Sequence, residues 1–158
     1  MSLFRSSSGK SSTAITRAGE ILGVDMHSHL LPGIDDGAKN LDESISLIRN
    51  FQELGYRKLI ITPHVNERFP NSSSLIHEKF ELLKARADEE KLDIQLEVAA
   101  EYQVSEYFEH LFKSKDLLTF GDQYLLIECS YYLPYPAFSI MIYELQLEGY
   151  NLILAHPE

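Results

Sequence analysis

The side chains of this sequence best suited to chemistry recur at a regular interval. They lie about one strand–helix–strand unit apart: the pair His27 and His29, then His64, Glu101, Glu128 and His156. Imidazole nitrogens and carboxylate oxygens together suit Zn, Mn or Fe, often as two or more ions bridged by a carboxylate. An isolated histidine is more often an ordinary surface residue, but four of the six histidines fall in this pattern. The recurrence therefore favours a metal centre.

Acidic residues flank the first histidine pair. His27 and His29 are two positions apart in an extended segment, so both rings project from one face, which Asp25 shares. We expect Asp25 to hydrogen-bond one ring and fix its tautomer. The turn that follows brings Asp35 and Asp36 close to the same pair.

Several other residues have both a functional and a structural interpretation. Glu128 is a weaker ligand candidate than Glu101, because it could instead pair with a buried Arg or Lys. Arg68, in the polar loop after His64, is a candidate phosphate contact. His77 and His110 lie in helical patterns and are predicted to be ordinary solvated side chains. A line of aromatic residues could form a substrate mouth or pack against a neighbouring loop: Tyr131, Tyr132, Tyr135 and Phe138.

The elements that must position these residues alternate between apolar strands and amphipathic helices. Strands are predicted over 21–26, 58–62, 93–100, 123–130 and 151–155, and helices over 41–54, 75–91, 105–114 and 138–148. Asn40 stands where the first of these helices needs an N-cap. The absence of hairpin signals predicts parallel strands with helical crossovers, hence an α/β barrel or a doubly wound sheet. In such folds, sites form at the carboxyl ends of the strands.

Composition limits the class of protein. The chain has 158 residues, 44% of them apolar, which predicts a globular domain. Residues 1–20 are predicted to be a flexible polar tail and 21–158 the folded domain. The net charge of -10 disfavours nucleic acid and anionic membrane surfaces as partners. A single cysteine fits a cytoplasmic location, and no apolar run reaches the roughly 18 residues of a membrane span.

Four motifs carry a family resemblance. They are VDMHSHLLPGIDDGAK (24–39), ITPH (61–64), AAEY (99–102) and AHPE (155–158). The sequence resembles the polymerase-and-histidinol-phosphatase (PHP) family, and within it the bacterial metal-dependent tyrosine phosphatases of capsule and exopolysaccharide biosynthesis. The likeness runs from about residue 21 to the end.

The resemblance implies a distorted, TIM-like (β/α) barrel of seven strands, of which this chain holds the first five β-α units. It implies two or three divalent ions, with manganese expected and iron or zinc as alternatives. The implied ligands are His27, His29, Asp36, His64, Glu101 and His156, with Glu101 bridging. The implied reaction is hydrolysis of phosphotyrosine by a metal-activated hydroxide, on the tail of a bacterial tyrosine kinase.

The resemblance also implies features beyond Glu158, namely two further β-α units and phosphate-binding arginines. We therefore expect a partial barrel with a depleted metal site and little or no phosphatase activity, or open sheet edges that pair in a homo-oligomer. A cysteine-dependent phosphatase mechanism is excluded, because it needs an Arg six positions after its cysteine and Cys129 has Tyr135 there. Two other functions stay open: a small-molecule phosphoesterase of the histidinol-phosphatase type, and a non-catalytic metal-binding or kinase-interacting module.

Overall fold

Strands and helices alternate along the chain, and all pairings between the strands are parallel, as the sequence pattern predicts. The computed structural model describes residues 17–130 and 135–157. The helices are α1 (Ala18–Leu22), α2 (Leu41–Glu53), α3 (Ser73–Glu89), α4 (Glu106–Ser114) and α5 (Phe138–Leu147). The strands are β1 (Val24–Ser28), β2 (Lys58–Ile61), β3 (His64–Val65), β4 (Gln95–Val98), β5 (Glu101–Gln103), β6 (Tyr124–Glu128) and β7 (Asn151–Leu154).

The strands form two short sheets, β1-β2-β4 and β3-β5-β6-β7, that continue into one another. Two residues separate β2 from β3, and two separate β4 from β5. Pro63, at the first break, lacks the N–H that a regular ladder needs. Hydrogen bonds cross the break nonetheless, from Ala99 N to Ile61 O (2.9 Å) and from Glu101 N to Pro63 O (3.0 Å). The second and third predicted strands, 58–62 and 93–100, thus correspond to β2 and β4. Two short strands beyond their predicted ends, β3 and β5, open with His64 and Glu101.

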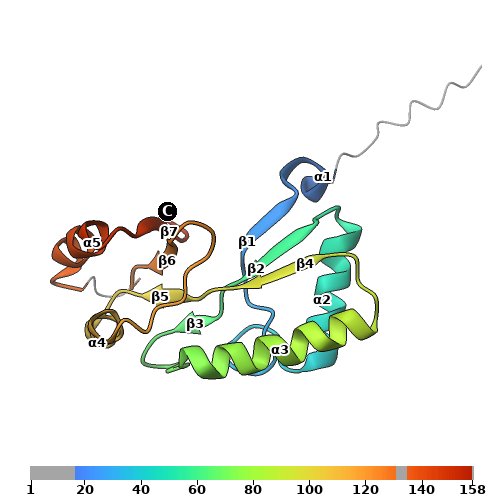
Figure 1. Cartoon of the computed structure of the whole chain (residues 1–158), viewed down its shortest axis with the longest axis horizontal. Helices are drawn as coiled ribbons and strands as arrows, with labels where there is room; N and C mark the ends of the chain where they lie inside the picture. The colour runs from blue at the N-terminus through green and yellow to red at the C-terminus, as the bar shows by residue number, and fades with distance from the viewer. Residues whose placement is uncertain (1–16, 131–134, 158) are drawn as a thin grey trace, which may run out of the picture.

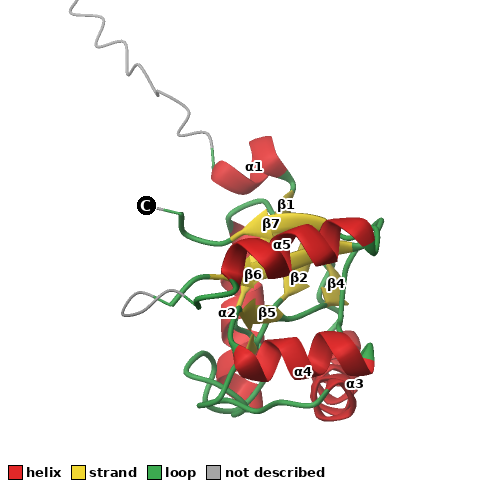
Figure 2. Ribbon diagram, turned by 90° about the vertical axis from the view of Figure 1, so that its left-hand side faces the viewer, coloured by secondary structure: helices red, strands yellow, loops and turns green. Residues whose placement is uncertain are grey.

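The helices and the site lie on opposite faces of the strands. In Figures 1 and 2, α2 and α3 lie beside β1, β2 and β4, whereas α4 and α5 lie beside β5, β6 and β7. Alternate strand residues such as Leu59 and Ile61 join the large core beneath these helices. The intervening ones, including Ile60, Ala99 and Leu126, form a second cluster. Because strand side chains alternate, Glu101 and Glu128 share the face of this second cluster.

The amino-terminal part differs from the prediction. Residues 18–22 form α1, although 18–20 were assigned to the tail and 21–22 to a strand, and β1 runs over 24–28 instead of 21–26. Gly19 lies so close to the backbone that a Cβ there would be 2.3 Å from Tyr56 N, so only glycine lets α1 dock. Gly23, with φ of 72°, then ends the helix. Residues 1–16 of the predicted tail lie outside the described residues.

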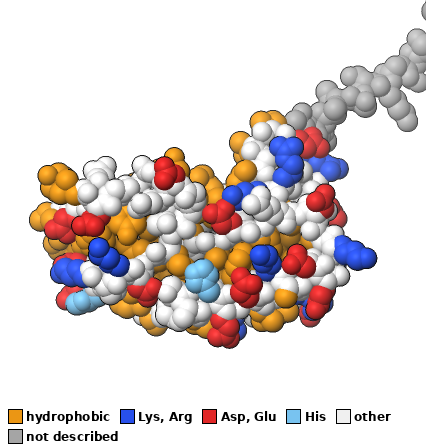
Figure 3. Space-filling view, in the orientation of Figure 1, with side chains coloured by type: hydrophobic (Ala, Val, Ile, Leu, Met, Phe, Trp, Pro, Cys, Tyr) orange, Lys and Arg blue, Asp and Glu red, His pale blue; other side chains and the backbone are white. Residues whose placement is uncertain are grey.

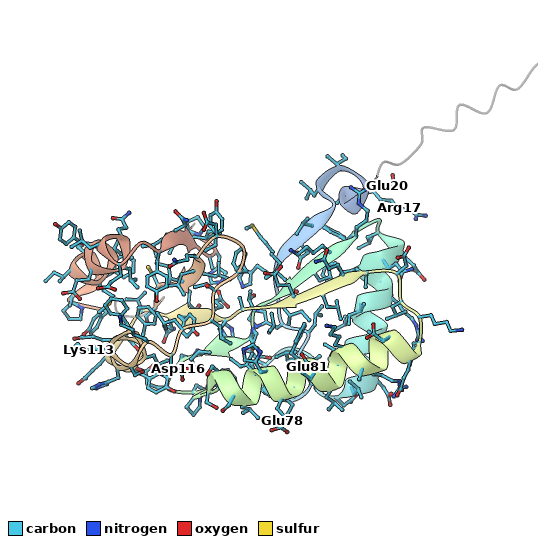
Figure 4. The ribbon with its side chains drawn as sticks, in the orientation of Figure 1. Arg17, Glu20, Glu78, Glu81, Lys113 and Asp116 are labelled. Atoms are coloured by element: carbon cyan, nitrogen blue, oxygen red, sulfur yellow. The ribbon has the colours of Figure 1, made fainter. Side chains whose placement is uncertain are left out.

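Charged side chains on the helical face account for part of the acidity of the chain. The space-filling view shows acidic and basic side chains interspersed between apolar ones (Figure 3). Glu78 and Glu81 are exposed on α3, and Glu78 points away from the sheet (Figure 4). Within the described residues, no helix combines the length and the apolar character that crossing a membrane requires.

Candidate metal centre

Glu101 is the centre of the cluster that the sequence predicts. Its side chain is fully buried. Its Oε2 lies 3.1 Å from Nε2 of His27, 3.4 Å from Nε2 of His29 and 3.0 Å from Nδ1 of His64. Its Oε1 lies 2.9 Å from Nε2 of His156. The structure thus brings together, around one carboxylate, four histidines predicted from sequence, which lie in or just after β1, β3 and β7.

Three groups of side chains offer ligand atoms close enough to share an ion. Within each group the atoms lie within 4.8 Å of one another. The groups are His27, Glu101 and His156; His29, Asp36 and His64; and His64, Glu101 and Glu128. Because Glu101 and His64 each belong to two groups, the geometry suits a cluster of neighbouring ions better than one isolated ion.

Two buried atoms of the cluster lack hydrogen-bond partners within the described part of the chain. They are Nδ1 of His64 and Oε2 of Glu101. The two atoms are 3.0 Å apart, but the angles between them are not those of a hydrogen bond. Leaving a buried polar atom unsatisfied is costly. Since both atoms are good ligands for divalent ions, the residues present fit a metal centre.

The electrostatics of the cluster favour an ionised carboxylate among basic imidazoles. Burial opposes ionisation of Glu101, yet the surrounding His27, His29 and His64 hold its pKa below its usual range. Burial by itself lowers the pKa of His29, but the hydrogen bond to Asp35 and the nearby charge of Glu101 raise that pKa to about 9. In the metal-free chain at neutral pH, a proton on His29 therefore offsets part of the carboxylate charge.

Asp35, and not Asp25, hydrogen-bonds a ring of the histidine pair, that of His29. Oδ2 of Asp35 lies 2.9 Å from Nδ1 of His29 and accepts a hydrogen bond from the backbone N–H of His64 (3.0 Å). Asp25 instead faces Ser28, and its buried Oδ2 has no hydrogen-bond partner among the described residues. The expectation for Asp25 was wrong because a sharp turn after β1 returns Asp35 to the ring.

The remaining predicted ligand, Asp36, and the weaker candidate, Glu128, both lie beside His64. Oδ1 of Asp36 lies 3.7 Å from Nε2 of His64, and its side chain is half exposed. Glu128 is nearly buried, with Oε1 3.5 Å from Nδ1 of His64. No Arg or Lys pairs with Glu128 in the described residues, so the alternative of a buried pair with Arg or Lys is not borne out. Burial, followed by the nearby charge of Glu101, raises the pKa of Glu128.

A cavity of about 390 Å³ opens beside the cluster. Its lining includes Asp36, His64 and Glu128 of the cluster, together with Arg68 and Phe69. The Phe69 ring stacks parallel to His64 with centroids 6.0 Å apart, and the Arg68 guanidinium carbon lies 4.9 Å from the Phe69 centroid. Arg68 is the one Arg or Lys among the described lining residues.

The other sequence candidates lie apart from the ligands. His77 and His110 are exposed on α3 and α4, as expected of solvated residues. Tyr135 hydrogen-bonds a carboxylate oxygen of Glu109 on α4 at 2.5 Å, so it packs against a neighbouring element. Tyr131 and Tyr132 lie outside the described residues.

The fold and the site together define a parallel α/β protein with a histidine–carboxylate cluster at the carboxyl ends of its strands. Residues 23–158 match the family model described as capsular polysaccharide synthesis, CpsB/CapC. The chain belongs to this family.

Relatives and a solved structure agree with this assignment. The chain is 34% identical over 138 residues to the putative tyrosine-protein phosphatase CapC of Staphylococcus aureus, covering 85% of this chain and 54% of the relative. It is 33% identical to tyrosine-protein phosphatase YwqE of Bacillus subtilis over the same shares. The fold also matches a solved chain, with a TM-score of 0.76 and 31% sequence identity. That chain comes from the crystal structures of YwqE from Bacillus subtilis and CpsB from Streptococcus pneumoniae, described as metal-dependent tyrosine phosphatases. That match covers 85% of this chain and 55% of the solved chain. The chain thus spans about half the length of these relatives.

Proposed function

We propose that the cluster around Glu101 binds two or three divalent ions and that the protein uses them to hydrolyse phosphotyrosine. The observation that carries this proposal is the contact of one buried carboxylate with four imidazoles, in three overlapping ligand groups. The relatives named above are tyrosine-protein phosphatases. Manganese is the expected metal, and iron and zinc suit the same ligands.

Each predicted ligand has a position that suits its role. Glu101 would bridge two ions, because its two oxygens face different histidines. His27 and His156 would complete one ion, whereas His29, Asp36 and His64 would hold another. Glu128 adds a ligand beyond the predicted set. When bound, divalent ions supply Lewis-acid chemistry, making water more acidic and neutralising charge on phosphoryl oxygens.

The cavity beside the cluster would receive the phosphate ester. Asp36 and Glu128 make its wall acidic, so a phosphate dianion needs cations there. Arg68 offers a guanidinium that can bind a phosphoryl oxygen. Phe69, held against His64, gives an apolar surface for an aromatic leaving group.

The fold and the substrate of the whole protein can be inferred from the same features. We infer that these strands are part of a seven-stranded, TIM-like PHP barrel, in which β2 with β3 and β4 with β5 each count as one strand. The inference rests on parallel strands that carry helices on one face and the site at their carboxyl ends. The substrate would be a phosphotyrosine protein in the cytoplasm, such as the tail of a tyrosine kinase. Nucleic acid is disfavoured as a partner by the net charge of -10.

A single-turnover assay tests the proposed reaction even if turnover by this length of chain is low. The full chain, in excess over substrate and loaded with Mn²⁺, is mixed with a phosphotyrosine peptide or with histidinol phosphate. We expect phosphate release from the peptide that stops when a chelator is added. Release from histidinol phosphate alone would assign a small-molecule phosphoesterase. Metal binding without release from either substrate would favour a non-catalytic, kinase-interacting module.

A further inference from the structure

Two buried asparagines hold the loop that follows His64. Asn66 and Asn71 are 8% and 7% exposed, and each uses one end of its carboxamide. Oδ1 of Asn66 accepts hydrogen bonds from the backbone N–H groups of Arg68 (3.0 Å) and Phe69 (2.9 Å). Nδ2 of Asn71 donates to the carbonyl oxygens of Ile34 (3.0 Å) and His64 (2.9 Å). One side chain therefore works as an acceptor and the other as a donor.

The contacts of Asn71 join two segments that both carry ligands. Ile34 belongs to the turn that holds Asp35 and Asp36, and His64 is itself a ligand candidate. The carboxylate of Asp35 accepts a hydrogen bond from the backbone N–H of His64, and the carboxamide of Asn71 donates one to the backbone carbonyl of His64. The backbone of His64 is thus held on both sides by groups tied to the 34–36 turn.

We propose that Asn71 is a positioning residue that keeps Asp36 and His64 at the spacing needed to share an ion with His29. This inference rests on the proposed metal centre, and it adds a residue that itself offers no ligand atom to the ion. Asp36 depends most on this support, because its side chain is half exposed and 3.7 Å from His64. Residues that support metal ligands in this way typically change metal affinity by about 10–100-fold when they are replaced.

The opposite use of the two carboxamides supplies a matched pair of variants. Asn66→Asp keeps the accepting oxygen, whereas Asn71→Asp replaces the donating nitrogen by an oxygen that repels both carbonyls. Both variants add the same charge next to the same loop. A general electrostatic or loop effect would therefore affect both variants alike.

Titration calorimetry of the full chain with Mn²⁺ measures the number of ions bound and the affinity of each. We expect Asn71→Asp to lose the ion shared by His29, Asp36 and His64, or to bind it at least ten-fold more weakly, while the ion held by His27, Glu101 and His156 binds as in the wild type. Asn66→Asp should bind all ions within about two-fold of wild-type affinity, since it keeps every hydrogen bond described above. A merely structural role for Asn71 would weaken all ions together.

Three outcomes would overturn the inference. Equal metal binding by the two variants overturns it while leaving the metal centre intact. Absence of Mn²⁺ binding by the wild-type chain overturns the metal centre, and this inference with it. If thermal unfolding shows that Asn71→Asp does not fold, Asn71→Ala removes the donors without adding charge. Retention of all ions by folded Asn71→Ala would then contradict the proposed role.

Discussion

Two polar clusters lie at opposite ends of the nearly continuous strands β2–β3 and β4–β5, and they are built differently. At the amino end, Lys58 of β2 pairs with Glu97 of β4, one cation with one anion, each about 30% exposed. At the carboxyl end, Glu101 is fully buried among four imidazoles, with Glu128 and Asp35 close by. The first cluster is neutral as a pair, whereas the second collects carboxylates without a Lys or Arg partner in the described residues.

The difference shows what each cluster requires. Lys58 and Glu97 neutralise each other's charge. The hydrogen bond from Lys58 holds the pKa of Glu97 below its usual range. Among the described residues, the carboxyl-end cluster keeps one buried atom each on His64 and Glu101 without a hydrogen-bond partner. Concentrated, buried carboxylates need external cations or bound protons. We therefore expect changes at the two ends to affect different quantities, metal binding at one and stability at the other.

The largest effect is expected from Glu101→Gln. The change keeps the shape of the side chain but removes the charge that faces all four imidazoles. We predict that calorimetry will show Mn²⁺ affinity at least a thousand-fold lower, about 4 kcal/mol, together with loss of phosphotyrosine hydrolysis. Glu97→Gln is the matched control at the other end of the strands, and it should bind Mn²⁺ within about two-fold of the wild type. A similar loss in both variants would remove the distinction between the clusters.

A change in the apolar core should act on stability alone. Ile48 of α2 is fully buried beneath the sheet, on the face away from the ligands. Ile48→Ala should lower the free energy of unfolding by about 3 kcal/mol, because it leaves a cavity. Denaturant unfolding of the metal-free chain measures this loss. The folded variant should bind as many ions as the wild type, and a missing ion would show that the core and the ligands are coupled.

Metal affinity should depend on pH through His29. With its pKa at about 9 in the metal-free chain, this imidazole is protonated at neutral pH and must lose its proton to bind an ion. Affinity for Mn²⁺ should therefore rise about ten-fold, or 1.4 kcal/mol, per pH unit between pH 6 and 8. Calorimetry in buffers of different ionisation enthalpy would also detect the released proton.

Asp35→Asn is the control for this dependence. It removes the charge that raises the pKa of His29 but keeps an oxygen that can accept from His64. Above pH 7, the affinity of this variant for Mn²⁺ should rise less steeply with pH than that of the wild type. An unchanged slope would show that Asp35 does not set the protonation of His29.

The smallest effect belongs to the amino-end pair. Glu97→Gln should lower the free energy of unfolding by about 0.5 kcal/mol, because partly exposed ion pairs contribute little. Thermal unfolding at low and high salt would measure it, and the difference from the wild type should shrink in high salt. A loss of several kcal/mol would mean that this pair is as critical to the fold as the apolar core.

The parts of this molecule that repeat were predictable from sequence. The alternation of strands and helices follows from apolar periodicity, and Asn40 caps α2 by accepting from Glu43 N at 2.9 Å, as its position predicts. The clustering of His27, His64, Glu101 and His156 follows because parallel strands bring their carboxyl ends together. Both features follow from the spacing of apolar residues and from the parallel order of the strands.

Features that depend on a single close contact were not predictable. The docking of α1 depends on the approach of Gly19 to Tyr56, which no periodicity encodes. The choice of Asp35 over Asp25 depends on a turn whose path is known only in three dimensions. Asn66 and Asn71 look like ordinary loop residues in sequence, because their burial comes from neighbouring segments. Glu128 had a readable signal, since it ends a strand two positions after a residue on the site face.

Electron paramagnetic resonance of the Mn²⁺-loaded full chain tests the central claim, that Glu101 is shared between neighbouring ions. Ions joined by one carboxylate lie about 3.5–4 Å apart, so their spins couple. We predict a broad, coupled signal at full loading that disappears in Glu101→Gln. A resolved six-line spectrum of isolated, protein-bound Mn²⁺ at full loading, unchanged by Glu101→Gln, would contradict the account.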